Sequence, residues 1–301
     1  MKGQWYSSPR YLEFVAAIHS GDLIALTVRL ERALAETHGA ELAFWLGIRA
    51  SRRIRVVSPM MDLAWDDLDE AMRLAPEDEE VQRGVLVNGL AVWLMTERSD
   101  RLRPLLTALR PHLWRLLRDP LIRTNLAALH MRSMRWATAY RAFTGALTRL
   151  HRMPPDVVRR RWGGFVPPLY ARRAVTAIAC GRMADAAADV ATADSLAGPA
   201  NASGSSAVVL TLARAELALA RGRIQDARSE LQREMPRRSD RPPVALDLRV
   251  EAELLAARLA RAENNTGAFQ HFCGRALALL EPQDLPVTRR HIQAVIDGAP
   301  Y

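Results

Sequence analysis

Two similar helix–turn–helix segments, displaced by 41 residues, constrain the fold of this chain more than any other feature. Residues 170–196 read YARRAVTAIACGRMADAAADVATADSL, and residues 211–231 read TLARAELALARGRIQDARSEL. In each segment, alanines at helical spacing precede a glycine, Gly181 or Gly222, and an alanine, Ala186 or Ala227, follows it at the same offset. Glycine favours the left-handed conformation that ends many helices. The pattern therefore predicts pairs of helices with small residues where the two helices touch.

Further segments of the chain repeat the same spacing. Their anchoring residues are Ala64, Leu68, Ala71 and Pro76; Leu126, Ala127, Trp136, Ala139, Phe143 and Ala146; Leu46 and Gly47; and Ala268 and Phe272. About seven helix pairs with a period of ~40 residues fit between Tyr11 and Pro282. One pair cannot bury its apolar face by itself, so a regular repeat of this length indicates pairs stacked side by side.

This offset pattern resembles the tetratricopeptide repeat (TPR) family, whose repeats of ~34 residues carry small and large residues at fixed positions. The pairs here are longer, as in the helical-repeat regions of bacterial signalling regulators. The resemblance implies an all-α fold, a right-handed α-solenoid of about seven stacked TPR-like pairs with a concave inner face.

A segment rich in proline, glycine and arginine interrupts the repeats. Residues 153–168 read MPPDVVRRRWGGFVPP. They lie between the anchoring alanines Ala139 and Ala186, which are 47 residues apart, whereas the corresponding alanines of the following pairs are 41 residues apart. We expect this segment to be a seam that separates N-terminal repeats, residues 1–152, from C-terminal repeats, residues 169–301.

In the TPR family, particular positions of each first helix line the concave groove and hold a segment of a partner. The resemblance therefore implies a non-enzymatic scaffold that binds a protein or peptide in this groove, in the manner of a regulatory or sensing adaptor. The residues at these positions are Asn88, Trp93, Thr124, Asn125, Met131, Arg132, Arg172, Val175, Ile178, Leu212, Glu216, Leu219, Glu253 and Arg261. Amides among them can hold a ligand backbone, and arginines can pair with acidic groups.

The basic character of the chain supports a second interpretation. The net charge is +9, and Lys2 is the only lysine beside many arginines. The densest cluster is Arg159, Arg160 and Arg161 next to Trp162. Guanidinium groups bind phosphate and an indole can stack on a base, so an arginine-rich solenoid that binds nucleic acid or another polyanion is the alternative. A solvated helix start explains the same run more simply.

An acidic run gives a third interpretation, a magnesium-dependent isoprenoid synthase. Residues 66–70 read DDLDE, which resembles the DDxxD motif that binds magnesium diphosphate from one face of a helix. However, Ala64, Leu68 and Ala71 occupy the buried stripe of the same helix, which would leave the acids on its exposed side. Aromatic residues make up only 6% of the chain, too few to line a carbocation cavity. We therefore predict no enzyme and no cofactor.

Cysteine and histidine usage predicts no metal site. The two cysteines, Cys180 and Cys273, support neither a disulfide framework nor a zinc site, and the seven histidines lack zinc-helix spacing. The start of the chain lacks the apolar stretch of a secretory signal, and Gly84–Thr96 falls short of the ~18 residues of a membrane span. We expect a cytoplasmic protein without membrane contact. Whether it forms a homodimer is left open.

Overall fold

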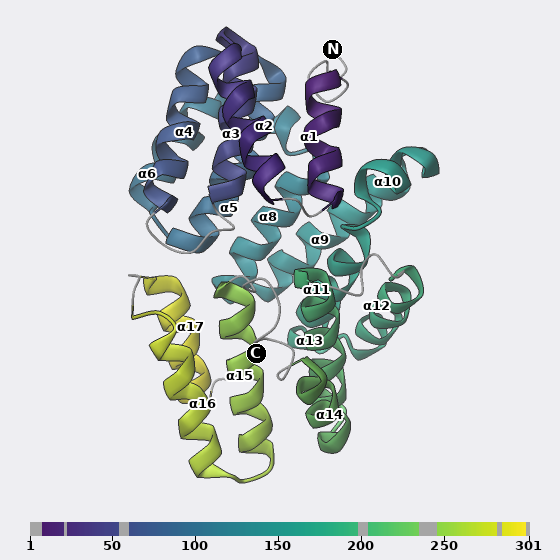
Figure 1. Ribbon diagram of the computed structural model, residues 1–301. Coiled ribbons are helices and arrows are strands. Elements are labelled where there is room, and N and C mark those ends of the chain that lie inside the picture. The colour runs from purple at the N-terminus through teal and green to yellow at the C-terminus, as the bar shows by residue number, and fades with distance from the viewer. Residues whose placement is uncertain are drawn as a thin grey trace. The chain divides into compact units, whose positions relative to one another are not determined.

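The computed structural model describes residues 8–20, 23–53, 60–197, 204–234, 246–281 and 285–298 (Figure 1). Within these ranges all regular structure is helical, which confirms the predicted all-α class. None of the described helices is both long enough and apolar enough to cross a membrane.

The chain divides into two compact units, Met1–Leu116 and Leu117–Tyr301. The segment predicted as a seam, residues 153–168, lies inside the second unit. It forms helix α10 (Pro155–Trp162) and the start of α11 (Val166–Ala179). Trp162 is buried in the core of that unit, and Phe165 packs against the same core. These two aromatic side chains bind the segment to the repeats around it.

The first unit contains three helix pairs among its described residues, α1 with α2, α3 with α4, and α5 with α6. Its helices are α1 (Pro9–Ser20), α2 (Leu23–Glu36), α3 (Gly39–Arg53), α4 (Met60–Leu74), α5 (Glu79–Thr96), α6 (Ser99–Leu109), the 3₁₀ turn η2 (Arg110–His112) and α7 (Leu113–Leu116). Ala64, Leu68 and Ala71, the stripe predicted for α4, are completely buried. Helix α5 packs against both α3 and α4, so neighbouring pairs share one core.

The second unit contains four pairs among its described helices, α8 with α9, α11 with α12, α13 with α14, and α15 with α16 (Figure 1). The helices not yet given are α8 (Pro120–Arg132), α9 (Trp136–His151), α12 (Met183–Leu196), α13 (Gly204–Ala220), α14 (Ile224–Glu234), α15 (Leu246–Ala262), α16 (Thr266–Ala278) and α17 (Pro286–Ile296). In each pair the earlier helix is called the first helix. First helix α11 packs against α9 and α13, and α15 packs against α13 and α14.

Alanines form the contact surfaces between these helices, as the sequence predicted. Ala139, Ala177, Ala186 and Ala227 are each fully buried. A methyl side chain lets two helix axes approach to the ~8–10 Å at which helices pack. The small residues therefore set how closely successive helices lie.

The turn inside each pair of the second unit contains one residue in the left-handed conformation. These residues are Met134 (φ 55°), Gly181 (φ 71°), Gly222 (φ 71°) and Asn264 (φ 57°). Glycine adopts this conformation without steric cost and asparagine tolerates it, whereas a methionine there is unfavourable. The sequence pattern located the two glycine turns, and the structure adds Met134 and Asn264 as their equivalents.

Candidate functional site

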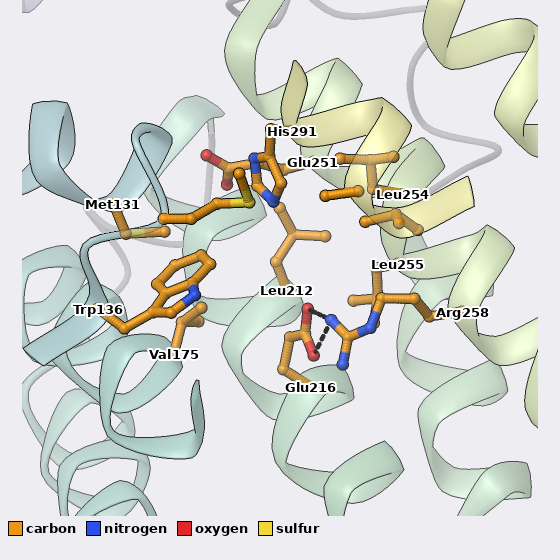
Figure 2. Close-up of a pocket in the computed structure, with 13 residues that line it drawn as sticks. Met131, Trp136, Val175, Leu212, Glu216, Glu251, Leu254, Leu255, Arg258 and His291 are labelled. Carbon is orange, nitrogen blue, oxygen red and sulfur yellow. Dashed lines mark hydrogen bonds and ion pairs between the residues drawn. The ribbon is translucent and has the colours of Figure 1, made fainter. Parts of the chain in front are cut away.

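A pocket in the second unit is lined by successive helices of the repeat (Figure 2). It encloses about 660 Å³ of space, which includes the part open to solvent. Helices α8 and α9 with the turn between them, the first helices α11, α13 and α15, and the final helix α17 all contribute side chains. The lining residues are Met131, Met134, Trp136, Val175, Leu212, Glu216, Glu251, Leu254, Leu255, Arg258, His291, Ala294 and Val295.

Helical periodicity explains why α15 turns one stripe of side chains toward the pocket. On α15 the lining residues Glu251, Leu254, Leu255 and Arg258 follow the spacing i, i+3, i+4 and i+7. Residues with this spacing share one face of a helix. The opposite face of α15 remains available for packing against its neighbours.

The walls of the pocket are mostly apolar. Figure 2 shows Met131 and Trp136 on one side, across from Leu254 and Leu255 on the other. Met134 also lines the pocket and lies in the turn between α8 and α9. Thioether side chains are flexible and polarisable, so they adapt to apolar groups of different shape.

An ion pair between α13 and α15 lies in this lining (Figure 2). Arg258 Nη1 donates to Glu216 Oε1 at 2.6 Å and to Oε2 at 2.8 Å. The Glu216 side chain is only 9% exposed, so Arg258 provides the partner that a buried carboxylate requires. The pair leaves no net charge at this part of the lining.

A second group of charges, the acid–arginine cluster, consists of Arg132, Arg172, Asp247 and Glu251. Arg172 Nη1 donates to Glu251 Oε2 at 2.5 Å, and Arg172 Nη2 lies 3.9 Å from Asp247 Oδ2. Arg132 Nη2 lies 3.7 Å from the same oxygen. Burial raises the pKa of Glu251, and the nearby Asp247 carboxylate raises it further, against the lowering effect of Arg172. The cluster connects α8, α11 and α15.

His291 connects the last helix to the first pair of the unit. Its imidazole meets the Trp136 indole edge to face, with the ring centroids 5.9 Å apart, and α17 also packs against α8. Burial, together with the positive charges of Arg132 and Arg258, lowers the pKa of His291 to about 4. The side chain is therefore neutral near pH 7, which allows it to lie beside two arginines.

The structure brings six of the predicted groove residues together at this site. Met131, Val175, Leu212 and Glu216 line the pocket. Arg132 and Arg172 belong to the acid–arginine cluster, whose Glu251 also lines it.

Other predicted groove residues of the second unit contact their own neighbours. Ile178 is buried in the core and Leu219 packs against it. Glu253 is buried and pairs with Arg275 at 2.9 Å. Arg261 Nη2 donates to the Ile296 carbonyl at 2.8 Å, which joins α15 to the end of α17.

The remaining predicted groove residues lie on α8 and in the first unit. Thr124 donates its hydroxyl to the Pro120 carbonyl within α8, and Asn125 is half-buried on the same helix. Asn88 Nδ2 donates to the Gly47 carbonyl at 2.8 Å, so it joins α5 to α3. The buried Trp93 donates its indole N–H to Ser99.

A one-residue difference in repeat length explains why the sequence analysis missed part of the pocket. The left-handed turn residue Asn264 follows Gly222 by 42 residues, whereas Gly222 follows Gly181 by 41. Each residue of error rotates a helix position by about 100°. Counting 42 residues from Leu212 and Glu216 reaches Leu254 and Arg258, which the structure places in the lining.

The arginine patch of the nucleic-acid interpretation does not offer an exposed indole. Trp162 is 6% exposed, and its ring lies 6.0 Å from that of Phe165. Arg159 is exposed, and the side chains of Arg160 and Arg161 lie outside the described residues. Base stacking on Trp162 would require this core contact to open.

The acidic run of the isoprenoid-synthase interpretation is engaged by arginines. Arg101 Nη2 contacts Asp66 at 2.7 Å and Asp69 at 2.9 Å. Asp67 is buried rather than exposed as expected, and it pairs with Arg49 and Arg53, each at 2.7 Å. The described part of the chain contains no group of three or more side chains placed to hold a metal ion.

No protein-family model matches this chain, and neither does any curated protein or any solved structure.

Proposed function

We propose that the chain is a TPR-like, right-handed α-solenoid that binds a peptide segment of a partner protein, as a non-enzymatic regulatory or sensing adaptor. One observation carries this proposal: the successive first helices α11, α13 and α15 each contribute side chains to a single pocket. Stacked helix pairs with a shared inner face commonly use that face to bind other molecules.

The polar groups of the lining support binding rather than catalysis. Glu216 is held by Arg258, and Glu251 is held by Arg172. His291, with a pKa of about 4, is a weak base near pH 7. These groups join helices to one another, and the apolar side chains between them provide the contact surface for a ligand.

A selection of peptides from a displayed random library on the immobilised full chain tests this function. The affinity of the selected peptides is then measured by calorimetry with the wild type and with the variant Val175→Arg. Val175 is half-buried and lines the pocket, so an arginine there should reduce affinity at least about tenfold. Equal affinity in the variant would place the binding site elsewhere.

Leu196→Arg provides the matched control. Leu196 is 48% exposed on α12, in the same unit, and is not part of the lining. Like Val175→Arg, this substitution replaces an aliphatic side chain by arginine. Because Leu196 lies outside the pocket, peptide affinity should stay as in the wild type. Circular dichroism should show the same helicity for both variants. Binding that falls about 10³-fold or more between 50 and 200 mM salt would instead favour the polyanion alternative.

A further inference from the structure

We infer that the pocket accepts an uncharged apolar side chain of the partner, such as leucine, methionine or phenylalanine, and that Met134 determines this specificity. The inference rests on the proposed function, because it names the group that the bound peptide inserts. It depends on the backbone of Met134, on the composition of the wall and on the charge balance of the lining.

The backbone of Met134 is in a conformation that its side chain disfavours. At the equivalent turns of the next two pairs the chain uses Gly181 and Gly222, and Asn264 follows in the fourth pair. A Cβ atom crowds the backbone carbonyl in the left-handed region, so glycine, which has no Cβ, is the favoured residue there. The turn is closed by hydrogen bonds from Met134 N to Met131 O at 2.9 Å and from Arg135 N to His130 O at 2.8 Å.

The side chain of Met134 explains why a glycine would not be equivalent at this turn. It lines the pocket together with Met131 and Trp136, whereas neither Gly181 nor Gly222 belongs to the lining. Unfavourable backbone conformations are typically kept at sites of binding or catalysis. A methionine side chain here supplies part of an apolar wall that glycine would remove.

The charges of the lining indicate that the inserted group is neutral. Glu216 is paired with Arg258, Glu251 with Arg172, and His291 carries no charge near pH 7. A charged ligand group would lose its hydration and would have to compete for partners that are already paired. An apolar group displaces water from Met131, Met134 and Trp136 without disturbing either pair.

Two fluorescent dyes with the same ring system test the expected chemistry. N-phenyl-1-naphthylamine is neutral, and 8-anilino-1-naphthalenesulfonate adds one negative charge. The full chain is labelled with ¹³C at the methionine methyl groups, and the signals of Met131 and Met134 are assigned from Met131→Leu and Met134→Leu. We expect the neutral dye to shift these two signals saturably, with at least about tenfold higher affinity than the sulfonate.

Met134→Gly separates binding from folding. The variant should unfold at a higher temperature, because it relieves the backbone conformation, and should bind the neutral dye at least about fivefold more weakly. Asn264→Gly is the matched control, because Asn264 has the same conformation at an exposed turn outside the lining. It should leave dye affinity unchanged.

Unchanged dye affinity in Met134→Gly, or tighter binding of the sulfonate at these two methyl groups, would overturn the inference. The proposed function has a separate readout in the Val175→Arg experiment with selected peptides. Peptides that lose affinity in Val175→Arg but insert a charged side chain would contradict only the inference. Expected dye behaviour with peptides unaffected by Val175→Arg would contradict the proposed function.

Discussion

Arg258 on α15 donates from one nitrogen to both carboxylate oxygens of Glu216 on α13, which lies 42 residues earlier in the chain. The two residues occupy equivalent positions of consecutive first helices. The repeat therefore places an acid and a base face to face across neighbouring pairs, and this contact forms part of the pocket lining.

Removing one partner of this pair should destabilise the second unit. Arg258→Ala leaves the carboxylate of Glu216 buried without its counter-ion, so we expect a loss of about 3 kcal/mol in the free energy of unfolding. Urea denaturation followed by circular dichroism measures the change. Replacing both residues by leucine should recover most of the loss. Arg223→Ala, which breaks the exposed pair with Asp226, should cost about 0.5 kcal/mol or less.

The free energy of unfolding should fall as the pH decreases from about 7 to 5, because of His291. Its pKa is about 4 in the folded chain and 6.5 for the unperturbed group. Between these values the unfolded chain binds a proton that the folded chain does not, so this contribution is present above pH 6.5 and decreases toward pH 4. The expected decrease from pH 7 to pH 5 is about 2 kcal/mol.

His291→Phe isolates this contribution, because phenylalanine keeps a ring against Trp136 and does not titrate. The raised pKa of Glu251 acts in the opposite direction and is common to both proteins. Chemical denaturation at the two pH values should therefore show a smaller decrease for the variant. An equal decrease in the two proteins would contradict the assignment to His291.

Adding a single methyl group at a glycine turn, by substitution with alanine, should lower the free energy of unfolding. Gly222 has φ 71°, and an added Cβ would meet no atom within 4 Å, so the effect of Gly222→Ala is conformational. We expect a loss of about 1 kcal/mol in thermal or urea unfolding. Gly274→Ala, on an exposed position of α16 with equally open surroundings, should stabilise by up to about 1 kcal/mol. The same sign for both substitutions would contradict this explanation.

Replacing a buried alanine at a helix contact by a larger residue should lower the free energy of unfolding. Ala177 on α11 is completely buried, so Ala177→Leu should destabilise the second unit by about 1–3 kcal/mol through overpacking. Ala191→Leu, on the exposed face of α12, is the matched control and should change stability by no more than about 0.5 kcal/mol. Differential scanning calorimetry of both variants measures the difference.

Part of the fold could be predicted because the decisive signals are local. The buried stripe of Ala64, Leu68 and Ala71 follows from helical spacing, and Gly181 and Gly222 end helices because of their own backbone freedom. Met134 and Asn264 perform the same task without glycine, so the turns they form carried no comparable signal.

A smaller part of the candidate site could be predicted in the same way. Val175, Leu212 and Glu216 were found because α11 and α13 precede clear glycine turns. On α15 the extra residue of the repeat shifted the predicted face to Glu253, whose side chain pairs with Arg275 instead. His291 lies on α17, beyond the last predicted helix pair, so the repeat pattern assigned it no groove position.

The all-helical class, the ends of several helices and the small side chains at the helix contacts follow from the order of amino acids alone, since they depend on neighbours within a few positions. The contacts of Trp136 with His291 and of Arg172 with Glu251, 79 residues away, arise instead from how the helix pairs pack in three dimensions. Such contacts depend on the sum of small rotations between successive helix pairs. A rotation of a few degrees at each step leaves the local pattern unchanged and changes which distant side chains line a common pocket.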